Sequence, residues 1–190
     1  REVVVDRLQR LYQWSVTPDQ IAFVPGVVTG FNLAAHAMKD PEGSIFIQTP
    51  VYSPFFYAAK HTNMSLNEME LTRKSDGSYE IDFDKFEAGI KNNTRMFLLC
   101  NPHNPVGKVY SRQDLEHMAK ICLENNVTIC SDEIHCDFIY SGHKHIPIAS
   151  INPEIAQNTI TLIAPSKTYN IAGLEASVVI IPNETLRKKY

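Results

Sequence analysis

Residues 95–132, RMFLLCNPHNPVGKVYSRQDLEHMAKICLENNVTICSD, decide the fold. The apolar runs at 95–100 and 127–131 each have the length and composition of a buried strand. Between them, Ser111 is followed three residues later by Asp114, a capping-box variant that predicts the start of a helix. A strand, a helix and a second strand in this order predict a right-handed crossover between two parallel strands.

The same alternation continues on both sides of this unit. Short apolar or alternating runs predict strands, and apolar residues at helical spacing predict helices. Further strands are expected at 21–24, 44–48, 64–71, 159–164 and 177–181, and further helices at 3–14, 27–39, 53–60 and 83–91, with a turn at Asp76-Gly77. The pattern predicts an α/β fold: a three-layer αβα sandwich with a mostly parallel sheet, formed by residues 1–190 as one domain.

Composition and charge exclude several classes of protein. Of the 190 residues, 44% are hydrophobic and 21% charged, so the chain can bury a full core and is not a disordered tail. The formal net charge is -3 and no basic run occurs, which argues against nucleic acid or an anionic membrane as a partner. No apolar stretch approaches the roughly 20 residues needed to cross a bilayer. None of the four cysteines forms a C-x-x-C pair, so we expect reduced thiols in a cytoplasmic protein.

The segments that follow the predicted strands are the candidate site, because ligands of parallel α/β sheets bind beyond the carboxyl ends of the strands. Pro25-Gly26-Val27-Val28 leads into a helix whose free backbone N–H groups suit a phosphate, with a plain turn as the alternative. After the run at 95–100, two Asn-Pro steps and a glycine form a rigid loop. This loop either aims the Asn104 amide at a ligand or only ends the strand.

Acidic and histidine residues follow the run at 127–131. Asp132-Glu133 after a strand would suit the magnesium site of a nucleotidase, but that interpretation requires a phosphate loop, G-x-x-x-x-G-K-[ST], which the sequence lacks. The spacing of the nearby histidines and cysteine fits no common zinc pattern, so we expect no metal and interpret them as loop residues. These residues are His135, Cys136, His143 and His145.

A lysine stands just past the run at 159–164, in the segment APSKTYNIAG at 164–173. Desolvation in such an apolar setting would favour the neutral amine of Lys167 and make it a usable nucleophile. A solvated surface lysine is the interpretation that we prefer when this residue is considered by itself.

Together these segments resemble the pyridoxal-phosphate enzymes of the aspartate-aminotransferase fold. The resemblance lies in Asn-Pro-His-Asn-Pro-x-Gly at 101–107, Ser-Asp-Glu-x-His at 131–135 and Ser-Lys-Thr-Tyr-Asn-Ile-Ala-Gly at 166–173. With Pro-Gly-Val-Val at 25–28, the sequence looks most like the carbon–sulfur β-lyase branch that includes cystathionine β-lyases of the MalY/PatB type. The resemblance covers essentially the whole chain and implies the cofactor-binding large domain of that fold.

The resemblance implies roles for residues around the ring of pyridoxal 5'-phosphate. Lys167 would bind the cofactor covalently and then act as a general base. Asp132 would pair with the pyridine nitrogen and Asn104 would hydrogen-bond the ring hydroxyl. Tyr52 would stack on the ring face. His135 stands where many relatives have a tyrosine that touches the ring hydroxyl.

The resemblance also implies how the phosphate is bound. The backbone N–H groups of Gly26, Val27 and Val28 would bind it, with the Ser166 hydroxyl. Many aminotransferases add an arginine eight residues after the lysine, but that position here is Glu175. This departure favours a lyase over a transaminase.

Two reactions follow from the residues that the resemblance implies. Elimination from cystathionine or an S-substituted cysteine would release a thiol, pyruvate and ammonia, and we favour this β-lyase activity. Transfer of an amino group between an amino acid and a 2-oxo acid, as in aminotransferases, is the alternative. A third alternative, the effector-sensing half of a transcription regulator, usually carries a basic DNA-binding module, which these residues do not contain.

The resemblance finally implies a larger assembly. Relatives are homodimers with the active site at the subunit interface, so we expect a homodimer that binds a small amino-acid substrate. Relatives also carry an N-terminal arm and a C-terminal small domain. We therefore expect residues 1–190 to be the central cofactor-binding part of a longer protein and to be inactive alone.

Overall fold

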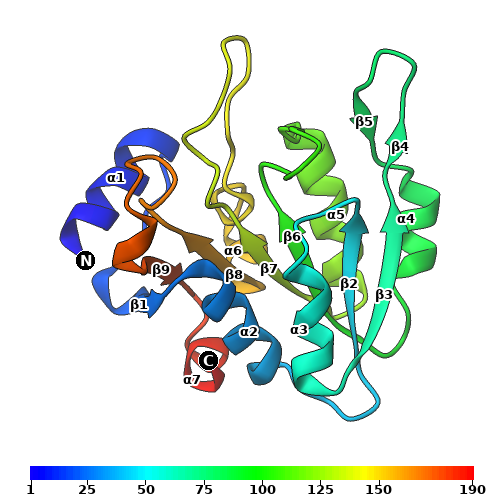
Figure 1. The fold of residues 1–190 in the computed structure, drawn as a ribbon. Coiled ribbons are helices and arrows are strands. Elements are labelled where there is room, and N and C mark those ends of the chain that lie inside the picture. The colour runs from blue at the N-terminus through cyan, green and yellow to red at the C-terminus, as the bar shows by residue number, and fades with distance from the viewer.

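The structure is a computed structural model that describes all 190 residues. A seven-stranded sheet forms its middle layer, in the order β1-β9-β8-β7-β6-β2-β3 (Figure 1). The strands are β1 (Ile21–Pro25), β2 (Ser44–Thr49), β3 (Ser65–Glu70), β6 (Thr94–Cys100), β7 (Thr128–Asp132), β8 (Thr159–Ile163) and β9 (Ala176–Ile180). Only β9 runs antiparallel to its neighbours, which are β8 and β1. All other pairs are parallel, so the expected mostly parallel sheet is confirmed.

Helices cover both faces of the sheet and confirm the three-layer arrangement (Figure 1). The helices are α1 (Glu2–Tyr12), α2 (Val27–Ala37), α3 (Phe55–Thr62), α4 (Phe83–Gly89), α5 (Arg112–Glu124), α6 (Pro153–Gln157) and α7 (Glu184–Lys189). One core lies between the sheet and α2, α3 and α7, and the other between the sheet and α4, α5 and α6. Successive residues of β6 alternate between the two cores: Met96 and Leu98 face the first, and Phe97 and Leu99 the second.

Local signals in the sequence explain where several elements begin and end. Ser111 Oγ accepts from Asp114 N at 3.0 Å, and Asp114 Oδ2 accepts from Ser111 N at 3.2 Å, so the predicted capping box of α5 is confirmed. The predicted Asp76-Gly77 turn joins β4 (Thr72–Arg73) to β5 (Tyr79–Glu80), and Gly77 there has a φ of 86°. The helix expected at 27–39 ends at Ala37, before the reversal into β2.

Short elements were not predicted from the sequence. They are the β4–β5 hairpin, α6 and three 3-10 turns, η1 (Pro18–Gln20), η2 (Ile148–Ser150) and η3 (Ala172–Leu174). Elements of this length are too short to show a periodicity. No helix combines the length and the apolar character that crossing a membrane requires. All four cysteines are free and buried.

Gly30 lets α2 pack directly on β8. A Cβ at this position would lie 2.6 Å from Leu162 Cδ2, and Leu162 is fully buried. We predict that Gly30→Ala lowers the free energy of unfolding by about 1 kcal/mol, because overpacking costs about 1–3 kcal/mol and the gain in helix propensity offsets about 1 kcal/mol. Urea denaturation measures the change. Gly173→Ala is the control, since nothing lies within 4 Å of its added Cβ. A Gly30→Ala protein as stable as the parent would contradict the prediction.

Candidate active site

The residues predicted from the sequence meet in one cavity of about 470 Å³ beyond the carboxyl ends of the parallel strands. Its walls come from the segments after β1, β2, β6, β7 and β8 and from the start of β9. All nine predicted positions line it: Gly26, Val27, Val28, Tyr52, Asn104, Asp132, His135, Ser166 and Lys167. Sequence reasoning did not include Thr29, Cys100 and Ser177, which also line the cavity. Cys100 and Ser177 lie at the ends of predicted strands and Thr29 lies in the first turn of the predicted helix at 27–39, and these positions were the only available signal.

The N-terminus of α2 forms one end of this cavity. Gly26 is the N-cap of the helix and has a φ of 94°, a backbone conformation that favours glycine. The first N–H groups of an α-helix have no intrahelical partner, so those of Val27 and Val28 can bind an anion.

Glu175 lines the cavity. Many aminotransferases of the fold that the sequence resembles have an arginine at this position. No arginine lines the cavity, and Lys167 is its only lysine. An anion bound there would therefore be met by backbone N–H groups and by the hydroxyls of Thr29, Ser166 and Ser177.

The His103 imidazole connects the two loops that carry Tyr52 and Asn104. Tyr52 N donates to Asn104 O at 3.0 Å, and His103 Nε2 lies 2.9 Å from the carbonyl oxygen of Pro50. Because a carbonyl only accepts, Nε2 carries the proton. The unprotonated Nδ1 lies 2.7 Å from the Tyr110 hydroxyl, which itself donates to Gln48 Oε1 at 3.1 Å. Burial lowers the pKa of His103 to about 4, which keeps the ring neutral. Sequence reasoning saw only a rigid loop here, since the burial of His103 depends on tertiary packing.

Asp132 is the last residue of β7, and its buried carboxyl group has too few hydrogen-bond donors to offset the cost of its burial. Its Oδ1 accepts from Ile134 N at 3.1 Å, and Oδ2 has no hydrogen-bond partner in the protein. Burial raises the pKa of Asp132 to about 7, opposed by the Ile134 N–H and the positive charge of Lys167, while the charge of Glu133 adds to the rise. The side chain lines the cavity, so a cation placed there would favour its ionised form.

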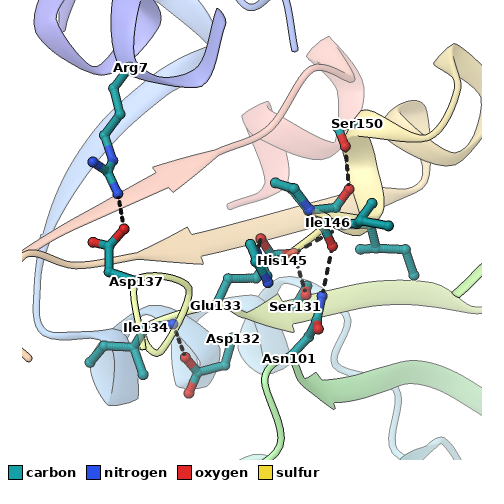
Figure 2. Close-up of polar contacts among 12 residues, drawn as sticks. Arg7, Asn101, Ser131, Asp132, Glu133, Ile134, Asp137, His145, Ile146 and Ser150 are labelled. Carbon is teal, nitrogen blue, oxygen red and sulfur yellow. Dashed lines mark hydrogen bonds and ion pairs between the residues drawn. The ribbon is translucent and has the colours of Figure 1, made fainter. Parts of the chain in front are cut away.

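Glu133, the next residue, is fully buried, and hydrogen bonds to both of its carboxylate oxygens offset the cost of its burial. Its carboxylate accepts from Ser131 Oγ at 2.9 Å, from Ile148 N at 3.2 Å and from His145 Nε2 at 2.9 Å. Figure 2 shows Asp132 and Glu133 leaving β7 in opposite directions, with Glu133 turned toward His145. These bonds fix the end of β7 and with it Asp132.

His145 was interpreted from the sequence as a loop residue with an improbable zinc alternative. It does lie in a loop, but as a buried partner of Glu133, and no group of three or more histidine, cysteine or acidic side chains could hold a metal ion. The distance of 12 residues between the two partners hides this contact from any local sequence pattern.

Lys167 lies in the turn that follows β8, and its side chain is exposed at the cavity. The solvated lysine that we prefer for this residue considered by itself is therefore confirmed, and the desolvated one is wrong. β8 ends at Ile163, and the next residues form a turn in which Tyr169 N donates to Pro165 O at 2.9 Å. This turn carries Lys167 out beyond the buried end of the strand.

His135 is half-buried on the loop after β7 and faces the same cavity. Burial lowers its pKa, and the positive charge of Lys167 lowers it further. The ring is therefore held in its neutral form, in which it can donate one hydrogen bond and accept another.

The buried Asp132 carboxyl makes stability depend on pH. Its pKa is about 7 in the folded protein and near 3.8 in an unfolded chain, so its contribution to stability is complete below pH 4 and is lost as the pH rises to 7. We predict that Asp132→Asn, measured by urea denaturation without added cofactor, gains up to about 4 kcal/mol relative to the parent between pH 4 and pH 8. Asp84→Asn on the exposed surface of α4 is the control. A difference between Asp132→Asn and the parent that does not change with pH would refute the prediction.

Comparison with known proteins identifies similar sequences and structures. The sequence model of the family "Aminotransferase class I and II" matches residues 1–189. Cystathionine beta-lyase PatB of Bacillus subtilis is 42% identical over 191 residues, an alignment that covers 100% of this chain and 49% of PatB.

Two solved structures share the fold closely. Cystalysin from Treponema denticola, which contains a pyridoxal 5'-phosphate cofactor, has a TM-score of 0.95 and 40% identity, covering 99% of this chain and 48% of cystalysin. The pyridoxal-phosphate-bound C-S lyase from Staphylococcus hominis has a TM-score of 0.93 and 36% identity, covering 98% of this chain and 49% of the lyase. The chain thus spans about half the length of these relatives.

Proposed function

Because the chain belongs to the aminotransferase class I and II family and resembles solved structures that contain pyridoxal phosphate, we propose that the protein is a carbon–sulfur β-lyase. Its substrate would be cystathionine or another S-substituted cysteine, and its products a thiol, pyruvate and ammonia. The observation that carries the proposal is a buried carboxyl, Asp132, whose free Oδ2 shares one cavity with the amine of Lys167. A cysteine β-lyase needs an amine and an acid that can hold a ring nitrogen protonated, in one site.

The donor set of the cavity fits the parts of pyridoxal phosphate. Lys167 would bind the aldehyde carbon, Asp132 the ring nitrogen and Asn104 the ring hydroxyl, and His135 lines the same cavity. Tyr52, whose backbone is bonded to that of Asn104, would cover the ring face. The fit at the ring therefore requires only groups that the structure already brings together.

The phosphate would be bound at the N-terminus of α2. The N–H groups of Val27 and Val28 and the Ser166 hydroxyl are the donors, and the partial positive charge of the helix end adds to their attraction. The expected Gly26 N–H is not among them, because it donates to Val24 O at 3.0 Å. Ser177 supplies a further hydroxyl from the start of β9. This arrangement would bind a phosphate without an arginine, although Glu175 also lines the cavity.

When bound, the cofactor supplies an electron sink that stabilises negative charge at the α-carbon of the substrate. Lys167 Nζ takes the α-proton as the general base. Asp132 stays ionised because a protonated ring nitrogen compensates its charge, and Ile134 N holds its other oxygen. His103 holds the loops of Tyr52 and Asn104 together, so that both residues keep their positions in the cavity.

An aminotransferase is the second candidate, supported by the family to which the chain belongs. Both reactions use Lys167 and Asp132 in the same way. The β-lyase is preferred because the relatives at 42%, 40% and 36% identity include a cystathionine beta-lyase and a C-S lyase. The cavity also carries Glu175 and no arginine for the phosphate.

We propose further that residues 1–190 are the cofactor-binding large domain of a longer cytoplasmic protein. The coverage of about half of each relative supports the first part of this proposal. The four free cysteines support a reducing compartment. Limited proteolysis of the longer protein, and the oxidation state of its cysteines in cells, test the two parts.

The activity is tested with the full-length protein, pyridoxal phosphate and cystathionine. We expect free thiol and pyruvate to appear without any 2-oxo acid, and Lys167→Ala to lower kcat by about 10²–10⁴-fold, the range that a lost general base accounts for. Lys120→Ala, on the exposed face of α5, is the control and keeps full activity. Conversion of the cofactor to its amine form without release of thiol would assign the protein to the aminotransferases instead.

We also propose a homodimer with the cavity at its interface. Phe23 on the edge strand β1 is 63% exposed and Tyr169 is 64% exposed. Both line a second, apolar cavity of about 310 Å³ that shares Ala176 and Ser177 with the first. Exposed apolar side chains concentrated beside a site are typical of a covered surface.

Phe23→Glu tests this assembly, because burying a carboxylate in an apolar interface is costly. We expect the parent protein to sediment as a dimer and Phe23→Glu as a monomer in analytical ultracentrifugation. Tyr57→Glu, an exposed aromatic residue on α3, is the control and stays dimeric. A monomeric parent protein would rule out the dimer.

A further inference from the structure

The loop that carries Lys167 has a single hydrogen bond to the rest of the protein. It runs from Ala164 to Glu175, between β8 and β9, and its other hydrogen bonds join its own residues, as when Ile171 N donates to Ser166 O at 3.0 Å. The exception is Thr168 Oγ1, which donates to Asp137 Oδ2 at 2.7 Å. Thr168 is the residue directly after Lys167.

Asp137 is itself held from the opposite side. Its Oδ1 lies 2.5 Å from Arg7 Nη2 of α1 (Figure 2), and the two side chains are 23% and 26% exposed. Asp137 follows His135 by two residues on the turn after β7, where Phe138 N donates to His135 O at 2.9 Å. One carboxylate thus joins α1, the His135 turn and the Lys167 loop.

We propose that Asp137 is a positioning residue for Lys167, acting through Thr168 and held by Arg7. The inference rests on the proposed role of Lys167 as the cofactor-binding amine. Because the Lys167 side chain is exposed, core packing does not fix its direction, and the position of its backbone decides where the amine can reach. The bond to Thr168 fixes that backbone one residue away.

The arrangement differs from an ordinary surface ion pair. Exposed pairs contribute little because two mobile side chains must be ordered for one contact. In this cluster each carboxylate oxygen has its own partner from a different segment, so ordering Asp137 once serves both contacts. A hydrogen bond to an ionised acceptor is also stronger than one between neutral groups. The group formed by Arg7, Asp137 and Thr168 therefore restricts the local mobility of the Lys167 loop more than it raises global stability.

The first experiment needs no cofactor. Amide hydrogen exchange of the full-length protein is compared for the parent, Asp137→Asn, Thr168→Val and Thr168→Ser. We expect exchange to become about fivefold faster at residues 165–175 in Asp137→Asn and Thr168→Val, the factor that a partly exposed pair supports. Thr168→Ser keeps the hydroxyl and restores protection. Asp40→Asn removes a comparable long-range pair with Arg95 and is the control that leaves the loop unchanged.

The second experiment follows covalent attachment of pyridoxal phosphate to Lys167, located by borohydride reduction and peptide mass. We expect the attachment rate constant at saturating cofactor to fall about fivefold in Asp137→Asn and Thr168→Val, with an unchanged half-saturating concentration. Thr168→Ser restores the rate.

Attachment rates that stay equal to that of the parent while the loop exchanges faster would overturn the positioning role. An unchanged amide exchange rate of the loop in Asp137→Asn and Thr168→Val would also overturn it. Faster exchange in a protein whose Lys167 never takes up cofactor would leave the Asp137 anchor standing and refute the proposed function instead.

Discussion

The parallel pairing of β2, β6, β7 and β8 is the constraint from which the site follows. Parallel strands place all their carboxyl ends at one edge, and each return of the chain must cross a face of the sheet. Helices fill those returns, so the edge itself is left to loops. Asn104 and Asp132 thereby come to one cavity although a whole helix, α5, separates them in the chain. The chemistry of the site depends on this geometry more than on any single contact.

Two adjacent acids at the end of β7 show how burial divides structural from functional groups. Glu133 has three donors, which satisfy the oxygens of its carboxylate and hold the loop beyond β7 against the body of the protein. Asp132 has one donor, so part of its desolvation is left uncompensated and its pKa rises. An under-compensated buried acid facing a cavity is poised to bind a cation. The hydrogen bonds of Glu133 fix the end of β7 and so keep Asp132 at the cavity.

Much of the fold could be predicted from the sequence, because the signals for it are local. The capping box at Ser111, the apolar runs of the strands and the Pro-Gly start of α2 each lie within a few residues. The site residues were found because they follow strands and match the motifs of a known family. The exposure of Lys167, the partnership of His145 with Glu133 and the contact between Thr168 and Asp137 depend on how distant segments pack, and no local pattern encodes them.

The reversal of β9 has a consequence for how the protein folds. β8 and β9 are antiparallel neighbours, so the loop between them closes locally, whereas every other connection between neighbouring strands of the site must first build a crossover. Closing a loop of roughly ten residues takes about 10–100 ns, far less than the formation of long-range parallel pairs. The loop that carries Lys167 can therefore close early in folding. Its contact with Asp137 forms later, when the turn after β7 and helix α1 have packed beside it.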